Sequence, residues 1–131
     1  MLALDTNVLA RLVTNDDPAQ ARRAAELIDS GEAFFVSLGV ALELEWVLRG
    51  AYALDAASVV RCFESLLSLR NLHFEAQAKV SEALKQYADK FDFADALHLG
   101  AAAQCTALLT FDKRFAARAQ KARTSLAVRL I

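Results

Sequence analysis

The chain has 131 residues, of which 56% are hydrophobic and 24% charged, and its formal net charge at pH 7 is −1. This composition predicts one folded domain over residues 1–131 and excludes a disordered chain. No run is apolar enough to span a membrane and no basic region precedes an apolar core as in a signal peptide, so we expect a cytoplasmic protein without membrane contact.

The N-terminal half shows two strand patterns and three helix patterns. Asp17 and Pro18 are typical of a helix start, Gly31 of a helix end and Ser37 of a helix cap. The expected elements are a strand at 2–4, helices at 7–13 and 18–30, a strand at 33–36 and a helix ending near 49.

The C-terminal half continues this alternation. Asp55 and Asp92 are positioned to cap helices. The expected elements are helices at 56–69, 75–88 and 92–104, strands at 72–74 and 107–110, a short basic helix and an edge strand at 126–130. Strands that alternate with helices predict an α/β fold, in which a short, mostly parallel central sheet is flanked by helices in three layers.

Charge is unevenly distributed along the chain. After Asp112 there are six basic residues and no acid, so residues 1–112 hold all sixteen acids and only nine bases. Such a basic segment can bind a polyanion locally, although an ordinary solvated helix face would show the same bias. Cys62 and Cys105 lie in apolar surroundings, where we expect core thiols instead of a disulfide.

Two acids directly follow predicted strands. Asp5 comes after the first strand and Asp112 after the strand at 107–110. Ligands bind at the carboxyl ends of strands in open α/β sheets, and two carboxylates side by side there would raise each other's pKa. The alternative for Asp5 is a capping role, which Thr6 and Asn7 could also serve.

A third acid lies on the helix that ends near residue 49. Glu43 has Val40 and Val47 at helical spacings, whereas Glu45 has Arg49 four residues on, a pair typical of a solvated face. We therefore expect Glu43 to face inward, where it would need a cation, a hydrogen-bond network or a metal. The alternative is that Glu43 points outward at the edge of the apolar stripe.

Two further acids open the helix at 92–104. Asp92 with Asp95 three residues later is close to a capping box, so capping explains Asp92. Asp95 has Phe91 and Leu99 at helical spacing and is expected to face inward. His98 is more typical of a core residue, or of one that supports a metal ligand, than of a ligand itself.

Four inward or strand-end acids would repel one another unless a divalent cation neutralised them. Oxygen ligands favour Mg²⁺ or Mn²⁺ over zinc, and no cluster of Cys and His competes. No Ser–His–Asp order, phosphate loop or glycine-rich dinucleotide turn occurs either.

Four sequence blocks now resemble a known family. They are Leu4-Asp5-Thr6-Asn7-Val8-Leu9, Leu42-Glu43-Leu44-Glu45-Trp46-Val47-Leu48, Asp92-Phe93-Ala94-Asp95-Ala96-Leu97-His98 and Thr110-Phe111-Asp112. In this order they resemble the PIN-domain nucleases, and among these the VapC-type toxins of bacterial toxin–antitoxin pairs, over essentially the whole chain.

The resemblance implies a metal-dependent endoribonuclease that an antitoxin protein inhibits. It assigns the acidic ligands of Mg²⁺ or Mn²⁺ to four positions. It gives supporting roles to Thr6, Asn7, Asp92 and Thr110. The four ligand positions are Asp5, Glu43, Asp95 and Asp112.

The basic residues after Asp112 and the large apolar residues suggest further partners. Lys113, Arg114 and Arg118 could grip the phosphates of an RNA substrate beside the metal. The large apolar residues exceed what so small a sheet covers, which together with the resemblance predicts a homodimer. Those residues are Phe34, Phe35, Trp46, Tyr52, Leu54 and Phe63.

Two other function classes share part of this pattern. A haloacid-dehalogenase-like phosphatase also begins with an Asp at a strand end, but it has a second acid two residues later, where this chain has Asn7. A receiver-like binding module would want an acidic pair before its phosphoacceptor strand and a strand-end Lys, and neither is evident. Mg²⁺-dependent cleavage of RNA, as opposed to hydrolysis of a phosphomonoester, separates these classes.

Overall fold

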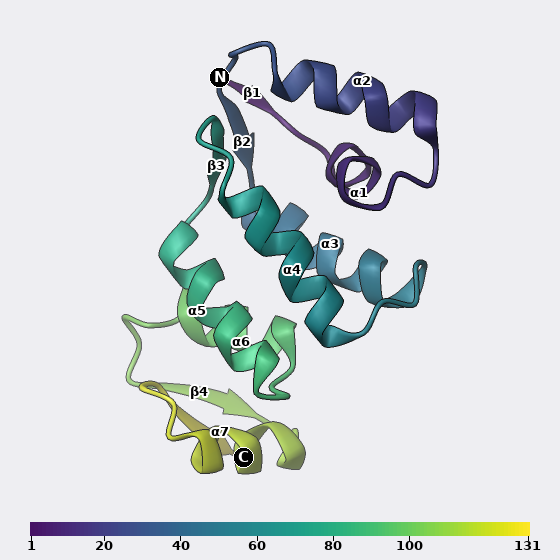
Figure 1. The fold of residues 1–131 in the computed structure, drawn as a ribbon. Helices are drawn as coiled ribbons and strands as arrows, with labels where there is room; N and C mark the ends of the chain where they lie inside the picture. Colours follow the sequence, from purple (N-terminus) through teal and green to yellow (C-terminus); the bar gives the residue numbers. More distant parts are fainter.

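The computed structural model describes residues 1–131 as seven helices and five short strands (Figure 1). The first six elements are β1 (Leu2–Ala3), α1 (Thr6–Thr14), α2 (Pro18–Ile28), β2 (Phe34–Val36), α3 (Leu38–Gly50) and α4 (Ala56–Leu67). The other six are β3 (Leu72–Phe74), α5 (Gln77–Ala88), α6 (Phe93–Ala101), β4 (Ala107–Thr110), α7 (Lys113–Ala122) and β5 (Ala127–Leu130). Every predicted element is present, with ends that differ by a few residues.

Local signals account for most helix ends. Asp17, Ser37, Asp55 and Asp92 each accept a hydrogen bond from the backbone N–H three residues on, which satisfies an orphan donor of the first turn. Gly31 has a φ of +85°, the left-handed conformation that suits glycine in the turn after α2. The capping predictions for Ser37, Asp55 and Asp92 are confirmed.

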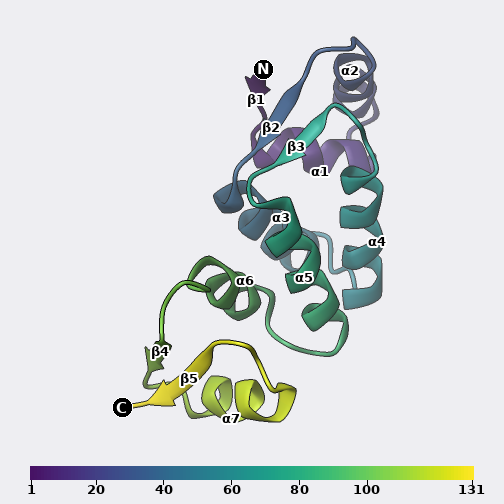
Figure 2. The same cartoon turned by 90° about the vertical axis from the view of Figure 1, so that its left-hand side faces the viewer.

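All strand pairs are parallel, and the α/β fold class with a short parallel sheet among helices is confirmed. One sheet has the order β1-β2-β3, with Phe34 of β2 opposite Leu2 on one side and Leu72 on the other. β4 does not extend this sheet; it pairs with β5 in a separate two-stranded sheet. Figure 2 shows β4, β5 and α7 together, below the other elements. The C-terminal ends of β1 and β4 therefore lie in different sheets.

The core lies between the three-stranded sheet and α3, α4 and α5. Phe34, Leu44, Phe63 and Val80 have no exposed surface, and each fully buried side chain of this kind contributes about 1.5–3 kcal/mol. The ring of Phe93 extends this core towards α6, because its centroid lies 5.3 Å from that of Phe63.

Several apolar side chains on the strands stay exposed. Leu2 on β1 is 53% exposed and Leu109 on β4 is 60% exposed. By contrast, Phe34 and Phe63 are fully buried in the core. These two residues therefore do not belong to the apolar surface that we expected a second chain to cover. Cys62 is half-buried, whereas Cys105 is exposed, so the expectation of a core thiol is wrong for Cys105. None of the helices could cross a membrane.

Candidate active site

A cleft of about 510 Å³ collects four acidic side chains from three parts of the chain. We call it the acidic cleft. Glu45 reaches it from α3, Asp92 and Asp95 from the start of α6, and Asp112 from the turn before α7. Its basic lining residues are Arg49, Lys90, Arg114 and Arg118.

Asp95 is the acid whose protonation responds most clearly to this arrangement. Burial first, and then the carboxylates of Asp92 and Asp112, raise the pKa of Asp95 above its ordinary value, while His98 and Arg118 oppose the shift. The inward position expected for Asp95 is confirmed in part, because the side chain is half-buried. Of the four acids expected to gather, Asp95 and Asp112 line the same cleft.

Backbone hydrogen bonds hold two of these acids in place. Oδ1 of Asp92 accepts from the N–H of Asp95 at 3.0 Å, so Asp92 caps α6 as predicted. Oδ1 of Asp112 accepts from the N–H groups of Arg114 and Phe115 at 2.9 and 3.0 Å. These bonds use one carboxylate oxygen of each residue. Oγ1 of Thr110 in turn accepts from the N–H of Asp112 at 2.9 Å, a contact that fits a supporting role.

The orientation predicted for α3 is wrong. Glu43 is exposed, and Glu45 is buried with only 4% of its surface accessible. The reason is that α3 turns its Ala41, Leu44, Glu45 and Leu48 side to the core, while Gly39, Glu43 and Trp46 face outward. The spacing of these buried residues is the signal in the sequence that could have identified Glu45.

Glu45 has partners that account for its burial. Nε of Arg49 donates to Oε1 of Glu45 at 2.8 Å, so the predicted pair exists, although not on a solvated face. Burial and the Glu45 carboxylate raise the pKa of Tyr87 to about 12. Glu43 forms no side-chain hydrogen bond or ion pair. It points outward, which is the alternative given in the sequence analysis.

Asp5 lies outside the acidic cleft. It is exposed and precedes α1 in an extended conformation, but its side chain makes no capping hydrogen bond, so the capping alternative is wrong. The neighbouring Thr6 is 2% exposed, and its hydroxyl is buried without a hydrogen-bond partner. Such a buried hydroxyl is uncommon, and here it adjoins a free carboxylate. Asn7 is exposed.

The expected acids therefore fall into two groups. Asp95 and Asp112 share the acidic cleft, whereas Asp5 and Glu43 do not line it. No three Asp, Glu, His or Cys side chains lie close enough to hold one metal ion. The donors fit Mg²⁺ or Mn²⁺ in chemistry, since they are carboxylate oxygens, but the four predicted ligands do not converge within one copy of the chain. For Asp5 and Asp112 the physical reason is the separate pairing of β4, and for Glu43 it is the outward-facing side of α3.

The basic residues also divide between surfaces. Arg114 and Arg118 line the acidic cleft as expected, whereas Lys113 lies beside a different hollow formed by α7 and β5. The cleft residues that the sequence analysis missed are Glu45, Arg49 and Lys90. His98 is exposed, so it is not a core residue.

Comparison with known proteins identifies the family to which this sequence is similar. The PIN domain family model matches residues 2–121. No curated protein matches the sequence. Among solved structures, the chain is similar to VapC20 of Mycobacterium tuberculosis, described as a toxin that cleaves the sarcin–ricin loop. The two share 20% identity over 89% of this chain and 94% of VapC20, with a TM-score of 0.46.

Proposed function

This chain belongs to the PIN domain family, and from that premise we propose that it is a metal-dependent endoribonuclease of the VapC type, a toxin that acts in the cytoplasm. The observation that carries the proposal is the acidic cleft, where Asp95 and Asp112 lie beside Arg114 and Arg118. Acids that repel one another attract a divalent cation, and adjacent arginines bind phosphate oxygens. The two together supply the charge stabilisation that metal-dependent cleavage of a phosphodiester uses.

The metal proposed is Mg²⁺ or Mn²⁺, held by Asp5, Glu43, Asp95 and Asp112. When bound, such an ion lowers the pKa of water and stabilises the charge that develops on phosphate oxygens. Glu43 stays in this set because its carboxylate is free, whereas that of Glu45 is bound by Arg49. Asp92 has a capping role, and its second oxygen remains available to the site.

The chain's own residues then position the substrate. The backbone bonds from Arg114 and Phe115 fix the Asp112 carboxylate at the start of α7, and Thr110 fixes its backbone. Arg114 and Arg118 are on successive turns of the same helix and bind the phosphates on either side of the bond to be cut.

A homodimer would bring Asp5 of one copy to the acidic cleft of the other. β1 pairs only with β2, and β4 only with β5, so each strand has one open edge that carries an exposed leucine. Open edges of this kind favour pairing with another chain. We assign the dimer contact to parallel pairing of β1 with β4 of the second copy, which places Asp5 beside Asp112 of that copy at the carboxyl ends of the strands.

The antitoxin partner has a suitable docking groove elsewhere. A hollow of about 700 Å³ between α1, α2 and α4 is lined by fourteen residues, nine of them hydrophobic, with Asp29 and Arg61 among the others. An amphipathic antitoxin helix can lay its apolar face there. The Leu12→Lys variant is expected to cleave RNA normally and to stay toxic in cells that express the antitoxin.

Purified protein and a mixed-sequence single-stranded RNA test the function. We expect cleavage with Mg²⁺ or Mn²⁺, none after chelation with EDTA, and no hydrolysis of a phosphomonoester. Phosphomonoester hydrolysis without RNA cleavage would instead identify a phosphatase. Absence of both activities in metal-loaded protein would favour a receiver-like binding module.

A further inference from the structure

A second, larger cleft adjoins the acidic cleft. It measures about 930 Å³ and lies between the end of α5 and the C-terminal half of α7. Only two of its twelve lining residues are hydrophobic. We call it the cationic cleft because it has five basic residues and two acids. The basic residues are Lys85, Lys90, Arg118, Lys121 and Arg123.

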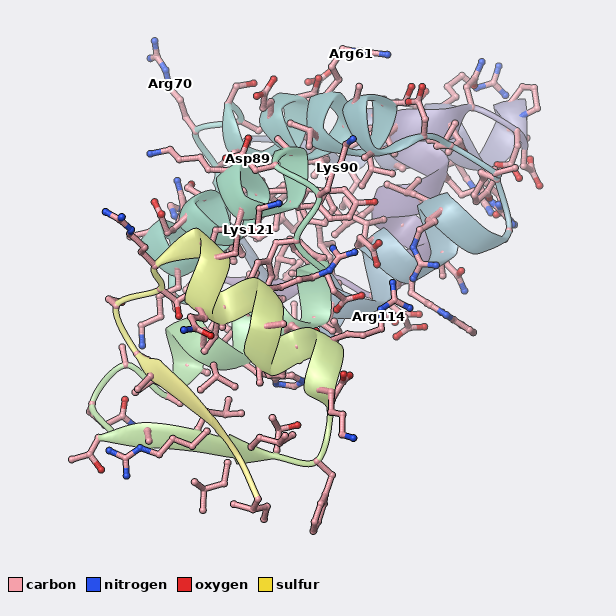
Figure 3. The ribbon with its side chains drawn as sticks, turned by 90° about the horizontal axis from the view of Figure 1, so that it is seen from below. Arg61, Arg70, Asp89, Lys90, Arg114 and Lys121 are labelled. Carbon is pink, nitrogen blue, oxygen red and sulfur yellow. The ribbon has the colours of Figure 1, made fainter.

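The two clefts adjoin each other. Lys90, Phe91 and Arg118 line both of them. A linear ligand whose reacting bond lies in the acidic cleft would therefore extend past Lys90 and Arg118 into the cationic cleft. Figure 3 shows Lys121 on α7 facing the segment that carries Asp89 and Lys90, with Arg114 on the side of the acidic cleft.

The residues that line both clefts are held in place by several contacts. The backbone of Lys90 is left-handed, with a φ of 69°, and its N–H donates to the carbonyl of Tyr87 at 3.0 Å. Arg118 donates to the carbonyl of Lys90, so the helix and the loop are tied together. The rings of Phe91 and Phe115 pack edge to face beneath them, 6.0 Å apart. These contacts hold the cationic side chains on a rigid support.

Most of this positive charge has no partner within the chain. Lys85 lies 3.7 Å from Glu82, but both side chains are largely exposed and such a pair contributes little. Lys90, Lys121 and Arg123 form no ion pair with an acidic side chain. Like charges gathered in a concave surface raise the local positive potential, and a polyanion relieves that repulsion.

We propose that the cationic cleft binds the phosphate backbone of the RNA strand next to the bond that is cut. The inference rests on the proposed ribonuclease activity and adds Lys90, Lys121 and Arg123 to the residues that contact substrate. A flat membrane surface does not fit a cleft of this shape, and the position directly beside the acidic cleft favours a nucleic acid strand.

The test measures binding separately from cleavage. A fluorescein-labelled, mixed-sequence single-stranded RNA is titrated with full-length protein in EDTA, and fluorescence anisotropy gives Kd at several salt concentrations. The double variant Lys121→Ala/Arg123→Ala should bind about ten-fold more weakly, and the slope of log K against log salt should fall by about 1.4, as two lost phosphate contacts predict. The charge-retaining variant Lys121→Arg/Arg123→Lys should restore both.

The matched control removes the same charge elsewhere. Arg22→Ala/Arg70→Ala changes two exposed arginines that line neither cleft, and it should bind RNA within two-fold of the parent. All four altered residues are exposed, so we expect the variants to fold, and thermal melting checks that only binding has changed. Parent-like affinity and salt slope in the folded Lys121→Ala/Arg123→Ala protein would overturn the inference. RNA binding without cleavage by the metal-loaded parent would instead refute the ribonuclease proposal and leave the cleft assigned.

Discussion

The pair Glu43 and Glu45 provides the sharpest test of the site, because two adjacent acids on one helix are assigned different tasks. Glu43→Gln and Glu45→Gln remove one negative charge each and keep the side-chain length. We expect Glu43→Gln to lose RNA cleavage by about 100-fold or more, since it weakens the proposed metal site. Glu45→Gln should cleave within about three-fold of the parent at 25 °C, because Glu45 is bound to Arg49.

The effect on stability should run in the opposite order. The Glu45 side chain is 6% exposed and that of Arg49 is 51% exposed, with 2.8 Å between them. A glutamine can still accept from Arg49, but the bond loses its charge assistance, a loss of about 1 kcal/mol once the exposure of Arg49 is considered. For a chain of this size that corresponds to a Tm lower by about 3–5 °C. Glu43→Gln should change stability by no more than about 0.5 kcal/mol, because Glu43 is exposed and unpaired.

Thermal melts followed by circular dichroism, and cleavage of a fluorogenic RNA in Mg²⁺, give both quantities from the same preparations. Full cleavage by Glu43→Gln together with lost cleavage by a folded Glu45→Gln would refute the reasoning. That result would make the Glu45 carboxylate a metal ligand in spite of its bond to Arg49.

Asp5→Asn should abolish RNA cleavage and leave the circular dichroism spectrum unchanged, because Asp5 is exposed and makes no capping bond; parent-like rates would remove Asp5 from the site. If β1 pairs with β4 of a second copy, mixing inactive Asp5→Asn with inactive Asp112→Asn should recover about one quarter of the parent activity after subunit exchange. Light scattering at micromolar concentrations should then give the dimer mass, and a persistent monomer mass would exclude the dimer. The hydrogen bond from Tyr52 lowers the pKa of Asp16 below its ordinary 3.8, so Tyr52→Phe should lower Tm at neutral pH. That difference should disappear as the pH falls below 3.8 and Asp16 is protonated, whereas a constant difference would show that packing, not ionisation, is responsible.

Local chemistry alone determined the elements of this protein and the start of its helices. A cap such as Ser37 or Asp55 bonds to a backbone N–H only three residues away, so its effect depends on the adjacent sequence and not on the rest of the fold. The run Ala107–Thr110 is likewise a strand with the predicted ends. The position of Asp112 followed from that run, because an acid directly after a parallel strand must lie at the strand's carboxyl end.

Tertiary structure decided which acids meet. An acid and an arginine four residues apart can pair on a buried or an exposed side of a helix, so Glu45 and Arg49 could not reveal which way α3 faces. That depended on packing against α1, α4 and α6, which buries Leu44 and Leu48. The separation of Asp5 from Asp112 depended on the pairing of β4 with β5, a choice between strands far apart in the chain. The backbone groups of a parallel strand can pair with any neighbour of suitable register, so the order of strands is settled only when the whole chain packs.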